Sequence, residues 1–143
     1  MGFTADFTAG LAQVLADAGA GSWKPTGTYA ASETAIVPGL VPASPDRLIT
    51  LTVYGWIDDP AQAESTLLLQ VRTRGTKDIR TSENTQDAVF ELLQNLPRRQ
   101  VGGVTVAGCW RRSAGYLGVD DNGRHAHSSN YEFRLGHPTR YRR

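Results

Sequence analysis

Residues 48–56 read LITLTVYGW and residues 67–75 read LLLQVRTRG, and these two stretches decide the fold. In both, apolar and polar residues alternate with a period of two, which is typical of a β-strand with one buried face. The face turned to the core would carry Ile49, Leu51, Val53, Leu67, Leu69, Val71 and Thr73. Arg72 and Arg74 would then project together from the opposite face.

Two further segments, residues 3–18 and 84–96, have the periodicity of amphipathic helices. Thr4 and Asn84 are candidate N-caps, and Pro97 would end the second helix. Each helix carries one apolar stripe, which would be buried by packing against one face of the sheet. The two stripes consist of Phe3, Phe7, Leu11, Val14 and Leu15, and of Ala88, Val89, Leu92, Leu93 and Leu96.

The remaining segments complete an α+β domain. Strands are expected at 104–111 and 130–135, joined by a long connection that contains the turn sequence Asp120-Asp121-Asn122-Gly123. Residues 20–47 contain several prolines and predict an extended arm with at most a short strand at 34–37; residues 138–143 predict a flexible tail. We therefore expect one domain over 1–143, with two layers: about four strands in a mixed or antiparallel sheet, and two helices on one face.

Charge is distributed unevenly along the chain. Residues 1–70 hold two basic and seven acidic residues, net −5, whereas residues 71–143 hold thirteen basic and seven acidic residues, net +6. Thirteen of the fifteen basic residues are arginine, a bias that suits subunit interfaces and that a GC-rich genome would also produce. The pairs Arg98-Arg99 and Arg111-Arg112 could contact phosphates or an acidic protein partner.

No pattern typical of catalysis or of a bound cofactor is present. The sequence lacks a G-x-S-x-G elbow and a phosphate-binding glycine loop, and Cys109 lies in the apolar stretch VTVAGCWRR, where it should pack in the core. His125 and His127 could chelate zinc or nickel together with Asp120, Asp121 or His137, although two histidines in such a loop are more often solvated. We expect no enzyme, no cofactor and no native metal site.

Four segments, taken in order, carry a family resemblance. They are AIVPGLVPASPDRLITLTVYGW (35–56), LLLQVRTRG (67–75), DAVFELLQNL (87–96) and VGGVTVAGCWRRSAGYLGVDDNGRHAHSSNYEFRL (101–135). Over about residues 3–137 the chain resembles the tail terminator, or minor capsid, proteins of long-tailed phages that infect actinobacteria.

The resemblance implies a structural virion protein. Such a protein forms a ring, usually a homohexamer, that caps the tail tube, ends its polymerisation and joins the tail to the head connector. Its partners would be further copies of itself, the major tail tube protein and a head-side connector or stopper protein. Genomic DNA would pass through the channel without specific binding. The protein would lie at the head-proximal end of the tail, and in the host cytoplasm during assembly.

The extended arm and the arginine-bearing strands are our candidates for subunit or tube contacts. The candidate residues are Tyr29, Ile36, Val37, Leu40, Arg47, Arg72, Arg74 and Arg111. Two alternatives remain open: another head-to-tail connector component, such as a stopper or tail-completion adaptor, and a small DNA-binding or metal-dependent accessory protein.

Overall fold

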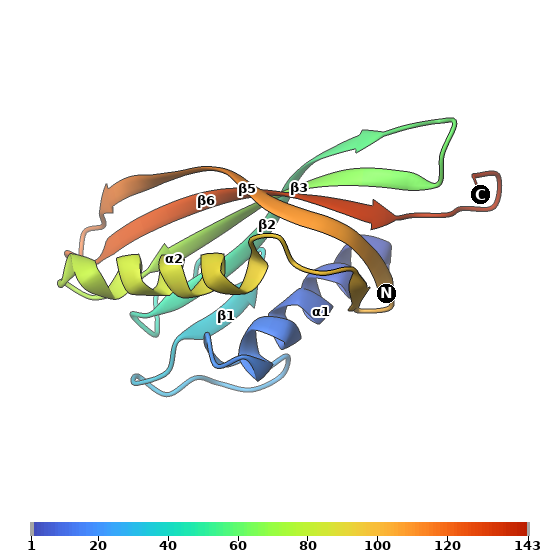
Figure 1. Ribbon diagram of the computed structural model, residues 1–143. Helices are drawn as coiled ribbons and strands as arrows, with labels where there is room; N and C mark the ends of the chain where they lie inside the picture. Colours follow the sequence, from blue (N-terminus) through green and yellow to red (C-terminus); the bar gives the residue numbers. More distant parts are fainter. Residues whose placement is uncertain (1, 143) are drawn as a thin grey trace.

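The computed structural model describes residues 2–142 as an α+β fold with two helices and a six-stranded, curled, mixed sheet (Figure 1). The elements are α1 (Phe3–Asp17), β1 (Ala35–Pro38), β2 (Leu48–Asp58), β3 (Glu64–Arg74), α2 (Ile79–Leu93), β4 (Arg99–Val101), β5 (Val104–Val119) and β6 (His125–Gly136). The predicted class is confirmed, but the prediction of two layers with about four strands is wrong, since six strands form one sheet that curls into a half-barrel. The prediction missed the three-residue β4, which is too short to show an alternating pattern, and it counted the arm strand only as optional.

The strand order across the sheet is β1-β2-β3-β6-β5-β4. Among the named strands within residues 2–142, the β1–β2 pair is parallel and the other four pairs are antiparallel. Both helices lie on the same face of the curled sheet, as Figure 1 shows. One apolar core joins them to that face, and within it the rings of Phe7 in α1 and Phe133 in β6 meet edge to face at 5.2 Å.

The period-two pattern of β3 predicted its two faces correctly. Leu67, Leu69 and Val71 are buried beneath the helices, and Arg72 lies on the opposite, outer face together with Arg74. β2 follows its pattern as far as Val53, where a β-bulge at Tyr54 shifts the register.

The first helix begins at Phe3 as expected, but Thr4 does not cap it. Gly2 occupies the N-cap position and provides no side-chain hydrogen bond. The second helix begins five residues earlier than predicted, at Ile79, and the carboxylate of its N-cap Asp78 accepts a hydrogen bond from the backbone N–H of Arg80 at 3.0 Å. Asn84 therefore lies inside the helix and caps nothing.

The contact between α2 and the sheet is partly polar. Val89 and Leu93 are buried as expected, whereas Ala88 is exposed. Towards the start of the helix, the side-chain amide of Gln86 donates to the backbone carbonyl of Ser128 at 2.9 Å. An apolar stripe could not predict this half of the contact, because the residues that make it are hydrophilic.

The β5–β6 hairpin is much longer than predicted. The expected strands, 104–111 and 130–135, extend to Val119 and start at His125, so the long connection is in fact a tight turn. The carboxylate of Asp120 closes this turn by accepting hydrogen bonds from the backbone N–H groups of Asn122 at 2.9 Å and Arg124 at 3.0 Å. Within residues 2–142, neither helix combines the length and hydrophobicity needed to cross a membrane.

Candidate assembly surfaces

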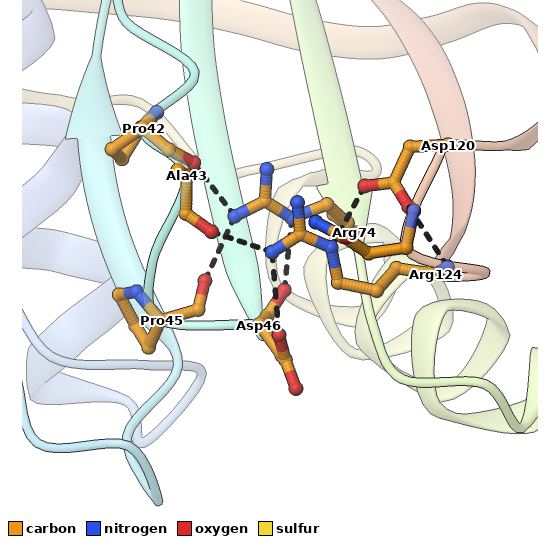
Figure 2. A network of polar contacts seen from close by, with 8 residues as sticks. Pro42, Ala43, Pro45, Asp46, Arg74, Asp120 and Arg124 are labelled. Carbon is orange, nitrogen blue, oxygen red and sulfur yellow. Dashed lines mark hydrogen bonds and ion pairs between the residues drawn. The ribbon is translucent and has the colours of Figure 1, made fainter.

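Two arginines hold the second half of the arm, residues 39–47, against the sheet (Figure 2). From the outer face of β3, the guanidinium of Arg74 donates to the backbone carbonyls of Pro42 and Pro45, both at 2.8 Å, and of Asp46 at 3.0 Å. Arg74 is only 4% exposed. The guanidinium donors of Arg74 are therefore engaged by the chain's own arm.

Arg124 is the second arginine of this network. Its guanidinium contacts the carboxylates of Asp120 at 2.7 Å and Asp46 at 3.2 Å, and it donates to the carbonyl of Ala43 at 2.5 Å. The backbone N–H and then the guanidinium of Arg124 hold the pKa of the Asp120 carboxyl below its ordinary value. Burial and the nearby charge of Arg124 lower the pKa of Arg74.

Sequence reasoning missed Arg124. The available signal was the spacing of Asp120 and Arg124 across an Asp-Asn-Gly turn, which permits a local ion pair. The contacts of Arg124 to the arm span about eighty residues of chain, and Figure 2 shows that they bring the arm beside the β5–β6 turn. No local pattern encodes such a contact.

The other arm candidates differ in accessibility. Ile36 is fully buried in the core, while Val37 and Arg47 are half-buried. The hydroxyl of half-buried Tyr29 donates to the carbonyl of Ile36 at 3.1 Å and so covers the outer edge of β1. Leu40 is 66% exposed and points to solvent.

The two remaining arginine candidates, Arg72 and Arg111, lie on opposite faces of the sheet. Arg72 is half-buried on the outer face beside a small cavity of about 60 Å³, and its Nε has no hydrogen-bond partner within residues 2–142. Arg111 lies on the inner face, where its guanidinium stacks 4.0 Å from the ring centre of Phe90 in α2. The structure thus brings Arg72 and Arg74 together and leaves Arg111 apart from them.

Five of the nine large exposed apolar side chains within residues 2–142 lie on two hairpins that the sequence did not indicate; the other four are Leu40, Val41, Ile79 and Tyr141. Tyr54 and Ile57 belong to the projecting β2–β3 hairpin, and Tyr116, Leu117 and Val119 belong to the β5–β6 hairpin; each is 49–58% exposed. Such exposed residues on protruding strands are typical of protein contact surfaces.

The three histidines do not converge on one site. Tyr116 lies between His125 and His127, and its hydroxyl is 2.8 Å from Nδ1 of His125. His137 lies beyond the other end of β6, stacked on Phe3 at 3.7 Å. Among residues 2–142, no group of three His, Cys, Asp or Glu side chains could hold a metal ion.

Cys109 packs in the core, as predicted. It is 1% exposed on the inner face of β5, opposite Phe133. Burial raises the pKa of its thiol, which keeps it in the unreactive protonated form.

Comparison with known proteins gives a clear family assignment. A family model described as bacteriophage tail terminator protein matches residues 14–136, which is most of the chain. A search of curated proteins found no match. The family model supports the predicted resemblance to tail terminator proteins, although it does not address the host, and the family is structural rather than enzymatic. The chain therefore belongs to the bacteriophage tail terminator family and is a structural component of the phage tail.

Proposed function

We propose that this protein forms a ring that caps the tail tube, ends tube polymerisation and provides the surface that joins the tail to the head connector. Its place would be the head-proximal end of the tail, with assembly in the host cytoplasm. The observation that carries the proposal is the family match over residues 14–136.

The surface of the fold is consistent with such a role. Termination by a ring requires a contact that is repeated between copies. It also requires one face that binds the end of the tube and an opposite face that differs from the tube, so that no further tube subunit can add. Leu40 on the arm, Tyr54 on β2 and Tyr116 on β5 offer apolar contacts in three separate places. Arg47 and Arg72 lie near the arm end and are our candidates for polar contacts there.

The experiment combines sizing and imaging. Purified protein is analysed by light scattering and negative-stain microscopy, alone and mixed with the major tail tube protein. We expect rings, and rings seated at one end of tubes whose growth has stopped. Protein that stays monomeric and never binds tube ends would contradict the proposal, and binding to the head connector but not to the tube would indicate a stopper or adaptor instead.

A further inference from the structure

Within residues 2–142, a long stretch of unpaired strand edge lies on each side of the sheet, one on β2 and one on β5. On the β1 side, the last hydrogen bond to the edge of β2 is donated by Gly39 to the carbonyl of Leu51 at 2.9 Å. On the β4 side, the connection after α2 covers β5 only as far as Arg111, whose N–H donates to the Gln94 side chain at 2.8 Å. Within residues 2–142, no segment pairs with the outer edges of residues 52–58 or 113–119.

We propose that the open edge of β5 in one copy pairs with the open edge of β2 in the next copy, which joins their sheets. This inference rests on the proposed function, since it names the contact that builds the ring. A contact between two different edges is head-to-tail, the type that generates rings. Both edges are seven residues long, and unpaired strand edges recruit other strands through their free backbone groups.

The strand directions favour an antiparallel joint. Three antiparallel steps, β2–β3, β3–β6 and β6–β5, separate the two edges, so β5 runs opposite to β2. Copies related by rotation keep their strand directions along the ring axis. The next copy's β2 would therefore lie antiparallel to β5, like all but one of the pairs within the sheet.

Backbone orientation suggests one register. The alternation of the ladders turns the N–H groups of Trp56 and Ala114 outward, so these residues can form a hydrogen-bonded pair. This register also keeps the two faces of the sheet matched, because Ile57 and Ser113 would meet on the outer face.

The offset between the edges suits a closed ring. Trp56 pairs with Leu67, and Leu67 pairs with Phe133, whereas Ala114 pairs with Ser129, which lies four residues before Phe133 in β6. Four residues span about 13 Å along the strand, and four strand spacings lead to the next copy's β2, about 19 Å across. Strands tilted by roughly 35° would bring both edges to one height, and this tilt lies within the range found in closed β-barrels.

Cysteine cross-linking tests the register directly. Ile57 and Ser113 would be neighbours in this joint, both on the outer face, because Trp56 packs inward and the amide of Asn130 bonds the Ser113 hydroxyl. Within one chain they are three strand spacings, about 14 Å, apart across the sheet and are also offset by four residues along it, which is beyond the reach of a disulfide. The oxidised variant Ile57→Cys/Ser113→Cys should form covalent multimers, and each single variant should remain uncrosslinked.

The matched control is Ile57→Cys/Gly115→Cys, which moves one thiol two residues along the same face. A cysteine side chain fits at Gly115, since a Cβ there meets no atom within 4 Å. This control should link poorly. Equal linking by both pairs, or by neither, would overturn the proposed register, and dimers of Ser113→Cys alone would show β5–β5 pairing instead.

Proline at Ala114 tests the backbone contact. Ala114→Pro removes one outward N–H without touching the β6 ladder, a position where strands accept proline. Ala114→Thr keeps the N–H and is the control. We expect Ala114→Pro to raise the dissociation constant of ring assembly about tenfold and Ala114→Thr to leave it unchanged, with both monomers folded by circular dichroism.

The outcomes separate the two proposals. A native protein that never assembles would contradict the proposed function itself. Native rings that are unaffected by Ala114→Pro would overturn only the strand pairing and would leave the function standing.

Discussion

Two extended segments at one end of the molecule differ in how their backbone groups are paired. In the arm, four carbonyls, those of Pro42, Ala43, Pro45 and Asp46, accept hydrogen bonds from Arg74 and Arg124. Residues 113–119 of β5, by contrast, have one backbone edge that no segment within residues 2–142 pairs with. Both segments lack strong patterns, and extension alone drew attention to the arm. The difference teaches that a segment is available to a partner where the fold leaves its backbone unpaired, irrespective of how irregular its sequence is.

Removing Arg74 should have the largest effect on stability. Arg74→Met leaves the carbonyls of Pro42, Pro45 and Asp46 without their donor, and we expect the free energy of unfolding to fall by about 3 kcal/mol. Urea denaturation measures this change.

The control is Arg134→Met on the outer face of β6. Its side chain is 55% exposed and its ion pair with Glu64 is long, 3.8 Å, so the loss should be about 0.5 kcal/mol or less. Equal losses in the two variants would show that the arm network contributes nothing special.

Sequence predicted the parts of the fold that repeat locally. Alternation placed Arg72 and Arg74 on the outer face, and the apolar stripe placed Leu93 in the core. It could not show that Arg74 is bound to carbonyls about thirty residues earlier, because that contact arises only when the arm folds back.

The missed part of β5 has a different cause. Residues 112–119 read RSAGYLGV, with two glycines and no sustained alternation, and bulges at 111–113 and 116–118 interrupt what pattern exists. Their strand conformation depends on pairing with β6. The β5 edge that we propose for assembly could therefore be found only after the pairing of β5 with β6 was known.

The next largest effect on stability is expected from acid, which should weaken the network of Arg74, Arg124 and Asp120 that holds the arm. The pKa of Asp120 is lowered in the folded protein, so its ionised form stabilises the fold above the unfolded pKa of about 3.9. This contribution is lost as the pH falls through the folded pKa. Asp120→Asn should reduce stability at neutral pH and flatten the loss between pH 7 and about pH 3, measured by urea denaturation.

Asp121→Asn serves as its control, because Asp121 is exposed and lies outside the network of Figure 2. It should leave the pH dependence unchanged. An unaltered acid dependence in Asp120→Asn would assign the acid sensitivity to other carboxylates, such as Glu33, whose hydrogen bond from Lys24 lowers its pKa to about 2.

The smallest effect on stability is expected from a substitution at the open edge of β5. Its effect on assembly should distinguish the β5 edge from the arm. Leu117 is 49% exposed, so Leu117→Lys should change the free energy of unfolding by no more than about 0.5 kcal/mol. A lysine on an open edge opposes strand addition, so ring assembly should nevertheless fail in light scattering. Leu40→Lys on the arm, where Leu40 is 66% exposed, is the matched comparison. If Leu40→Lys abolished rings while Leu117→Lys assembled normally, the arm and not the β5 edge would be the subunit contact.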